Sequence, residues 1–344
     1  MQEIVIKTTT RCNLNCLYCN VEENEPMDIT IDGVKNFLSF VSKSFPGEII
    51  KVRWHGGEPL LLGYAFFKEA FEIQEKLPSV FENELSTNLT LLDDTFIKLF
   101  CDYDVTIKTS LDGLDSNNDL QRSNSRKVVI FALEELKTAG FKKVHIKSTF
   151  SKHNIGEITV IYKYCCSLPF IWEFSTIIPA GLKQREASEL LVDPTVFSKN
   201  VIGIFEYWFE NSPIDIPLFS NTIKLFIQPS EFKNKSMPRL GIGPDENIYK
   251  CPLLIGNRNH KIGHYSSKNS LKNFQSIDCS WKHLSHGKCN KCKYARICRI
   301  NSCAYLAVAS ETHTGLAEYL CSSWEPVYDY IFEKVGGALD KIII

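Results

Sequence analysis

The sequence predicts an α/β fold, a partial (β/α)6 TIM-like barrel followed by a small cysteine-rich domain at the C-terminal end. Residues 3–178 alternate six short β-rich runs with amphipathic helical patterns, which is typical of a parallel sheet covered by helices. From Gly241 onward the chain is rich in Cys and Gly and too small to fold around a core of its own. Six units are too few for a complete eight-unit barrel, and a doubly wound sheet is the other arrangement that fits the pattern.

Each predicted strand is a short β-rich run: Glu3–Thr8, Ile49–Trp54, Glu84–Thr87, Asp104–Leu111, Lys143–Phe150 and Phe170–Ile178. The helical patterns between them are Thr30–Ser44, Tyr64–Lys76, Asp93–Cys101, Val128–Ala139 and Asn154–Cys165. In the fourth helix, Val128, Phe131 and Leu136 form the expected apolar face, and Gly140 is the expected stop.

The rest of the chain is less periodic. Residues 179–192 predict a connector that leads into a helix near Pro194–Glu210, and 211–245 predict loops and short strands because prolines are frequent there. A last helix is expected over Glu325–Lys341. The predicted organisation is therefore a barrel over 1–192, a bridging region over 193–240 and the cysteine-rich domain over 241–344.

Composition excludes several classes of protein. The 344 residues carry 39 Lys and Arg against 40 Asp and Glu, so the chain lacks the basic excess of simple nucleic-acid and anionic-membrane binders. A charged fraction of 23% with 12% aromatic residues argues against a largely disordered chain. No apolar run approaches the ~18 residues needed to span a bilayer, and the N-terminus lacks a secretory signal. The sequence therefore predicts a cytoplasmic protein that binds neither nucleic acid nor membrane.

Cysteine is unusually frequent. Thirteen Cys without an export signal favour metal ligation or redox chemistry over disulfides, because the cytosol keeps thiols reduced. Ten of them fall into two groups, one near each end of the chain. The other three, Cys101, Cys165 and Cys166, are expected to be small buried hydrophobic residues on helices.

The first group directly follows the first predicted strand. Cys12, Cys16 and Cys19 have the spacing C-x3-C-x2-C. Three thiolates can hold three irons of a [4Fe–4S] cube and leave the fourth iron without a protein ligand, which suggests catalysis. Zinc is the other reading, but it would need a fourth Cys or His that is not close in the sequence.

This spacing, with the aromatic Tyr18 just before the third Cys, resembles the radical S-adenosylmethionine (SAM) superfamily. The resemblance implies that Cys12, Cys16 and Cys19 hold a [4Fe–4S] cluster whose open iron chelates SAM. It also implies reductive cleavage of SAM to a 5′-deoxyadenosyl radical that abstracts a hydrogen atom, with a low-potential flavodoxin or ferredoxin as electron donor. The protein would mainly position and shield this chemistry.

Further segments at strand ends resemble motifs of the same family. Gly56-Gly57-Glu58-Pro59 resembles its GGEP motif, which implies contact with the SAM amino group; glycines permit close approach and a carboxylate can bind an ammonium. Residues 86–92 resemble the TNGTLL segment, but Leu89 replaces a glycine, so the turn geometry there is in question. Ser110-Leu111-Asp112-Gly113 resembles the SLDG segment of SPASM-containing members, and Arg122 stands where these members carry an arginine. The predicted SAM contacts are Tyr18, Gly56, Gly57, Glu58, Pro59, Asn88, Ser110 and Arg122, the last expected at the SAM carboxylate.

Asp112, at the end of the fourth strand, is the candidate for a general acid or base, although it can equally bind SAM or cap a turn.

The second cysteine group consists of Cys251, Cys279, Cys289, Cys292, Cys298, Cys303 and Cys321, with the spacing C-x2-C-x5-C-x4-C from Cys289 to Cys303. It resembles the SPASM domain, which carries auxiliary iron–sulfur clusters in peptide and protein maturases. Taken alone, its Cys pairs would also suit a zinc ribbon. The sequence departs from the SPASM pattern where Lys268 stands for an expected Cys and where Cys298 and Cys303 are spaced C-x4-C. Two closed clusters need eight Cys and this region has seven, so loss of the second cluster is an open alternative. The predicted ligands are Cys289, Cys292, Cys298 and Cys321 for a closed cluster, and Cys251, Cys279 and Cys303 for a cluster with an open site.

These observations predict a radical SAM enzyme that modifies a precursor peptide of a ribosomal natural product, with oxidative cross-linking as the expected reaction. A second hypothesis is an anaerobic sulfatase maturase, which oxidises a Cys or Ser of a protein to formylglycine. A third is a non-catalytic protein stabilised by Zn or an Fe–S cluster. Because the first strand begins at residue 3, leader-peptide recognition is expected to use other surfaces or a separate leader-binding protein.

Overall fold

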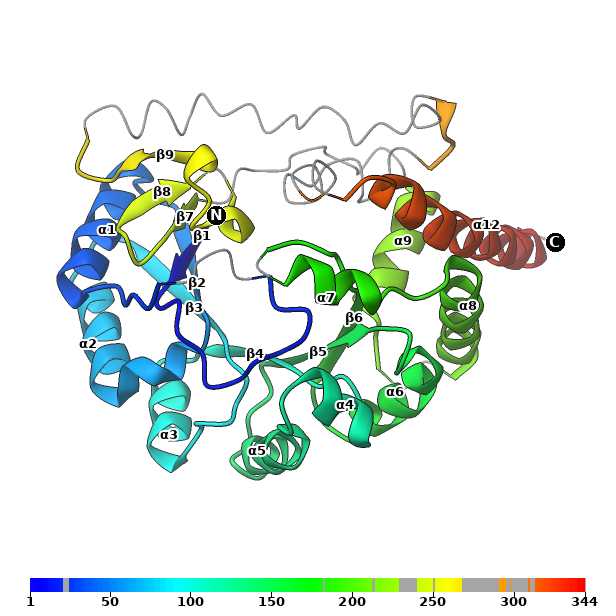
Figure 1. Ribbon diagram of the computed structural model, residues 1–344, viewed down its shortest axis with the longest axis horizontal. Coiled ribbons are helices and arrows are strands. Elements are labelled where there is room, and N and C mark those ends of the chain that lie inside the picture. The colour runs from blue at the N-terminus through cyan, green and yellow to red at the C-terminus, as the bar shows by residue number, and fades with distance from the viewer. Residues whose placement is uncertain are drawn as a thin grey trace.

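The structure, a computed structural model, describes residues 1–20, 25–181, 183–211, 214–228, 240–249, 251–267, 291–294, 298, 309 and 313–343. Six parallel strands lie side by side in the order β6-β5-β4-β3-β2-β1. Helices line the outer side of this curved sheet (Figure 1). The predicted α/β fold, a partial TIM-like barrel, is confirmed. The strands are β1 Gln2–Lys7, β2 Ile49–His55, β3 Val80–Ser86, β4 Thr106–Ser110, β5 Val144–Phe150 and β6 Ile171–Thr176.

The helices of the barrel pack apolar faces against the sheet. In α1, Thr30 caps the N-terminus by accepting a hydrogen bond from the Gly33 N–H (2.9 Å), and Val34, Phe37 and Val41 are fully buried. Trp54 of β2 packs edge-on against Phe67 and Phe71 of α2. The barrel helices are α1 Ile31–Ser44, α2 Gly63–Glu75, α3 Asp94–Asp102, α4 Ser116–Gln121, α5 Arg126–Thr138 and α6 Ile158–Cys166, with short 3₁₀ helices at Pro59–Leu62 and Ile155–Glu157.

The chain beyond β6 extends the same sheet. Strand β7 (Leu240–Ile242) pairs in parallel with β1, and β8 (Asn247–Tyr249) and β9 (Lys261–His264) continue antiparallel. The long helix α12 (Leu316–Ile343) lies along α8 (Pro194–Asn211), where Trp324 packs edge-on against Phe197 (Figure 1). The other elements are α7 Gln184–Glu189, α9 Pro217–Ile227 and 3₁₀ helices at Pro252–Leu254 and Arg258–His260.

Three sequence-based expectations about helices are wrong. Residues 217–227 form α9 and not loops or strands, because Pro217 stands at the first helical position, where a missing N–H costs nothing. On α5, Leu136 is fully buried as expected, but Phe131 is 66% exposed and Val128 46%, because Val129, Ala132 and Leu133 form the rest of the buried face. The last helix begins at Leu316, well before the expected start.

The isolated cysteines are buried to different degrees. Cys165 is fully buried, as expected. Cys166 is only partly buried, and the expectation for Cys101 is wrong because Cys101 is exposed. On α3 the buried residues are Phe96, Leu99 and Phe100, and Cys101 lies on the other side of the helix. None of the helices in the described ranges is both long and apolar enough to cross a membrane.

Candidate functional site

The loop that carries Cys12, Cys16 and Cys19 (the cysteine loop) leaves the carboxyl end of β1. Backbone hydrogen bonds hold it against the end of β2. The Gly57 N–H donates to the Thr9 carbonyl and the Glu58 N–H to the Arg11 carbonyl, both at 2.8 Å. A Cβ atom on Gly57 would lie 2.1 Å from the Arg11 carbonyl oxygen, so only glycine fits there. The close approach expected of the GGEP glycines is therefore made to the cysteine loop, and their contact with SAM stays a prediction.

The buried carboxylate of Glu58 connects the turns that follow β2 and β3. Its carboxylate accepts hydrogen bonds from the Leu60 N–H (3.0 Å), the Thr87 hydroxyl (2.7 Å) and the Asn88 N–H (2.7 Å). Burial raises the pKa of Glu58, although these donors act to lower it. The side chain therefore joins the turn after β2 to the turn after β3, and its interaction with the SAM ammonium stays a prediction.

Asn88 connects the turn after β3 to the cysteine loop. Its side-chain amide donates to Asn13 Oδ1 (2.9 Å) and lies 3.9 Å from Cys12 Sγ. Asn13 in turn donates to the Thr90 hydroxyl (2.7 Å). Asn13 and Thr90 were missed by sequence reasoning, because a contact between two loops leaves no periodic signal in either one.

The question raised by Leu89 is answered by its backbone. Its φ is 62°, the left-handed conformation that favours glycine, and its side chain is 1% exposed. A non-glycine residue in this conformation costs about 1–2 kcal/mol, and burying a leucine offsets this by about 1.5–3 kcal/mol. Leucine can therefore replace glycine because the apolar core takes up its side chain.

We expect Leu89→Gly to lower the free energy of unfolding by about 1–3 kcal/mol, because the buried side chain is worth more than the relieved strain. Urea denaturation of the full chain measures this. The matched control is Asn124→Gly, at an exposed position whose φ of 57° is also left-handed, and there we expect no loss. A Leu89→Gly variant more stable than wild type would contradict this interpretation.

The partly buried Tyr18 of the cysteine loop contacts two buried polar side chains, Asp112 and Arg122. The Tyr18 hydroxyl donates to the Asp112 carboxylate, and Arg122 Nη1 donates to the Tyr18 oxygen at 2.8 Å. Asp112 is fully buried and Arg122 is 7% exposed. Arg122 is also close enough to Cys16 to lower the pKa of this thiol electrostatically, although burial raises it overall. The structure thus brings Tyr18, Arg122 and Cys16 together, and the SAM contacts expected of Tyr18 and Arg122 stay predictions.

Asp112 has the surroundings of a positioning residue. One carboxylate oxygen accepts the Thr149 N–H of β5 (2.8 Å), and the other accepts from Tyr18 and, at 3.4 Å, from Gln121. Burial raises the pKa of Asp112, and Arg122 opposes this effect. With no exposed surface and both oxygens bonded, Asp112 joins β4, β5 and the cysteine loop, and this geometry does not support the expected general acid or base.

The donors around the loop fit an iron–sulfur cluster with a carboxylate-bearing ligand. Cys12, Cys16 and Cys19 provide three thiols on one loop, and Arg122 Nε is buried with no hydrogen-bond partner among the described residues. In the described ranges, both at this loop and elsewhere, no three Cys, His, Asp or Glu side chains converge on a position for one metal ion. A four-iron cube spreads its thiolates over different irons and needs no such convergence.

Ser110 and Pro59 complete the predicted SAM contacts. Ser110 is the last residue of β4 and is partly exposed, while Pro59 is buried at the start of a 3₁₀ helix. Their contacts with SAM stay predictions.

His55 supports the GGEP turn in its neutral form. Its Nδ1 accepts a hydrogen bond from the Gly56 N–H at 2.7 Å, which requires that this nitrogen carry no proton. Burial, together with Lys7 and Arg53, lowers the pKa of His55 to about 4.

The unfolded chain therefore binds a proton at His55 below its ordinary pKa of 6.5, while the folded chain does not until about pH 4. We expect the free energy of unfolding to fall by about 1–3 kcal/mol as the pH falls through this window. Denaturation at stepped pH measures this, with His55→Gln expected to flatten the curve. Replacement of the exposed His153 by Gln is the control that should keep it; an unflattened His55→Gln curve would contradict the assignment.

Only part of the C-terminal cysteine group lies in the described residues. Cys251 and Cys298 both pack against the small apolar cluster formed by Ala180, Leu254, Ala309, Leu316 and Leu320. The Tyr294 N–H donates to Cys292 Sγ at 3.4 Å, and Cys321 lies on α12. Cys279, Cys289, Cys303 and Lys268 lie outside the described residues, so the predicted auxiliary ligand sets stay predictions.

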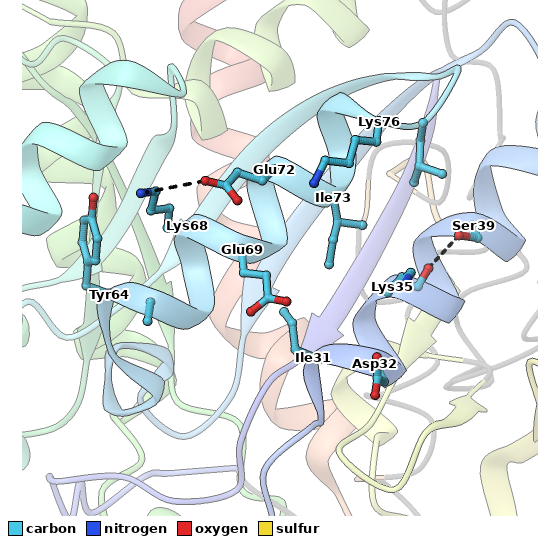
Figure 2. A pocket seen from close by; sticks show the side chains of 12 residues that line it. Ile31, Asp32, Lys35, Ser39, Tyr64, Lys68, Glu69, Glu72, Ile73 and Lys76 are labelled. Carbon is cyan, nitrogen blue, oxygen red and sulfur yellow. Dashed lines mark hydrogen bonds and ion pairs between the residues drawn. The ribbon is translucent and has the colours of Figure 1, made fainter.

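A cavity of about 600 Å³ lies elsewhere, between α1 and α2 (Figure 2). Its walls carry charges of both signs, with Lys68 3.9 Å from Glu72 and Asp32 and Glu69 also among the lining residues. None of the residues predicted to bind a cofactor lines this cavity. It is therefore not the candidate site.

Comparison with known proteins agrees with this geometry. Residues 6–165 match the radical SAM superfamily. The chain is 22% identical to a cysteine-type anaerobic sulfatase-maturating enzyme of Clostridium perfringens, over 98% of each chain. It is 25% identical to a serine-type anaerobic sulfatase-maturating enzyme of Klebsiella aerogenes, over 87% of this chain and 78% of that one.

Solved structures show the same fold. Native anSMEcpe with bound AdoMet superposes with a TM-score of 0.82 at 21% identity, covering 99% of this chain and 100% of the other. The same comparison with native anSMEcpe bound to AdoMet and the Cp18Cys peptide has a TM-score of 0.81 at 22% identity, covering 99% of each chain. The cysteine loop and the strand-end motifs lie within the matched residues 6–165, and this part of the chain is a radical SAM domain.

Proposed function

We propose that this protein is a maturase that oxidises one Cys or Ser side chain of a protein, in the manner of an anaerobic sulfatase-maturating enzyme. The observation that carries the proposal is the match to a cysteine-type enzyme over 98% of both chains, which includes the C-terminal cysteine region. A serine-type enzyme also matches over most of this chain. The peptide bound to anSMEcpe, a protein with the same fold, supports a polypeptide substrate.

The comparisons support a radical SAM enzyme, but they do not specifically support the cross-linking reaction expected from the sequence. The proposed substrate is accordingly a Cys or Ser side chain, and the precursor peptide is not retained as the leading substrate. The flavodoxin or ferredoxin donor and a separate leader-binding protein stay predictions.

The chain's own residues support this chemistry by holding and orienting. Cys12, Cys16 and Cys19 would hold a [4Fe–4S] cluster, and Asn88 keeps their loop in place through Asn13. The buried Nε of Arg122, which has no hydrogen-bond partner in the described part of the chain, is a donor for the carboxylate of SAM. When bound, the cluster and SAM supply a carbon radical able to remove a hydrogen atom from an unactivated C–H bond.

The electron balance assigns a role to the C-terminal region. Removal of two electrons converts a Ser side chain to an aldehyde and a Cys side chain to a thioaldehyde, which water then hydrolyses to the aldehyde with release of hydrogen sulfide. One leaves with the abstracted hydrogen atom, and the other must pass to an acceptor as a proton is released. An auxiliary iron–sulfur cluster is the proposed acceptor, either the one predicted at Cys289, Cys292, Cys298 and Cys321 or the one predicted at Cys251, Cys279 and Cys303.

The test is anaerobic reconstitution with iron and sulfide, followed by incubation with SAM, a reductant and a synthetic peptide carrying the sulfatase Cys or Ser motif. Mass spectrometry should show an aldehyde in the peptide, with 5′-deoxyadenosine formed in equal amount. The same peptide with Ala in place of Cys or Ser is the control and should not change. Deoxyadenosine formation with a cross-linked peptide and no aldehyde would overturn the proposal in favour of cross-linking, and no deoxyadenosine at all would favour a non-catalytic protein.

A further inference from the structure

The inner face of the sheet is lined with charged residues. Alternate residues of the strands face opposite sides, and those facing the helices, such as Trp54 and Ile146, are fully buried. The alternate positions face inward and include both signs of charge. The inward cations are Lys7, Lys51, Arg53, Lys108 and Lys147, and the inward acids are Glu3, Glu82, Glu84 and Glu173.

The inward acids at the centre of this face are shared among several cations. Glu84 is 1% exposed and pairs with Arg53, with Lys51 at 3.2 Å and with Lys108 at 3.4 Å. Burial acts to raise the pKa of Glu84, but Arg53, Lys108 and Lys51 outweigh it and the pKa is lowered. Glu173 lies 3.9 Å from Lys108. Glu84 and Glu173 are therefore already paired with other cations of this face, which leaves neither of them solely for a further cation.

Lys147 is such a further cation. It lies on β5 in register with Ser110 of β4 on one side and Glu173 of β6 on the other. Its side chain is exposed, and no carboxylate of the described residues lies within ion-pair distance of its ammonium. Surrounding protein atoms still lower the pKa of Lys147 by desolvation, with Glu173 acting in the opposite direction.

The position of Lys147 places it beside the candidate site. Two residues further along β5, the Thr149 N–H donates to Asp112, which binds Tyr18 of the cysteine loop. Its register neighbour Ser110 is a predicted SAM contact. The Lys147 ammonium has no carboxylate partner among the described residues. Its charge would be compensated by an anion that enters the barrel with a ligand.

We propose that Lys147 binds a carboxylate of a ligand that enters the barrel. The proposal rests on the proposed function, because it specifies a chemical feature of the substrate. Two sources provide a carboxylate: an acidic side chain of the polypeptide substrate, and SAM itself. Arg122 already offers a donor for the SAM carboxylate, so the polypeptide is the expected source.

The test measures binding with the anaerobically reconstituted full chain, by calorimetry, for wild type, Lys147→Met and Lys147→Arg. The probes are SAM, decarboxylated SAM, and two pools of Cys peptides that differ only in one Glu or Gln at varied positions. The matched control is Lys142→Met, at an exposed lysine next to the same strand. It should behave as wild type toward every probe.

If the polypeptide is the source, Lys147→Met weakens binding of the Glu pool about tenfold, leaves the Gln pool and SAM unchanged, and is rescued in part by Lys147→Arg. If SAM is the source, Lys147→Met weakens SAM about tenfold and leaves decarboxylated SAM unchanged. Equal affinities of wild type and Lys147→Met for all four probes, including equal failure to bind, would overturn the proposal. Wild-type protein that binds the Glu pool through Lys147 but forms no aldehyde would refute the proposed function alone.

Discussion

Replacement of Arg122 by methionine should lower the free energy of unfolding by about 3 kcal/mol or more. Arg122 is the cation beside the fully buried Asp112, to which it is linked through the Tyr18 hydroxyl. Methionine keeps the packing of the aliphatic stem but removes the charge. Removing one partner of a buried charged pair leaves the other uncompensated, which typically costs about 3–5 kcal/mol.

Urea denaturation of the full chain under anaerobic conditions measures this change. Arg185→Met is the matched control, because the Arg185 side chain is 92% exposed and its ion pair with Glu189 is worth little. We expect the control to change stability by less than about 0.5 kcal/mol. An Arg122→Met variant as stable as the control would show that Asp112 does not depend on this cation.

Replacement of Cys16 by alanine should abolish SAM cleavage. If Cys12, Cys16 and Cys19 each hold one iron, loss of one thiolate leaves the cluster with two ligands in this loop, and the cluster should not assemble. Iron content after anaerobic reconstitution and the yield of 5′-deoxyadenosine measure the two consequences. Deoxyadenosine should fall to the level seen without protein.

Cys101→Ala is the control for this experiment, because Cys101 is exposed on α3 and belongs to neither cysteine group. It should keep the wild-type iron content and deoxyadenosine yield. Cys16→Ala protein that still cleaves SAM would contradict the assignment of Cys16 as a ligand, and the same comparison applies to Cys12 and Cys19.

The stability of the site and its chemistry are coupled through the same few contacts. Asp112 and Glu58 are buried acids that bind backbone N–H groups of neighbouring strand ends, and each also reaches the cysteine loop or the turn beside it. Buried carboxylates are tolerated when every oxygen is bonded, as it is here. Substitutions at these positions are therefore expected to disturb both folding and the placement of the cysteines.

Features that depend on local patterns could be predicted from the amino-acid sequence. Period-two runs and helical periodicity predict the six parallel strands and their helices, because burial of one face constrains nearby residues in a repeating way. The spacing of Cys12, Cys16 and Cys19 identifies the superfamily, because three ligands within one loop are a local signal. Even there the phase of a helix could be misjudged, as at Phe131, since two neighbouring faces of α5 are both partly apolar.

Features that depend on contacts between distant segments could not be predicted from the sequence. Lys7 donates to the carbonyl of Ile255, 248 residues away, and β7 pairs with β1. The roles of Gly57, Glu58 and Asp112, and the lack of an ion pair for Lys147 among the described residues, likewise arise from backbone groups and charges that other strands bring close. Such contacts impose no period on the sequence, because a hydrogen bond or an ion pair depends on position in space and not on separation along the chain.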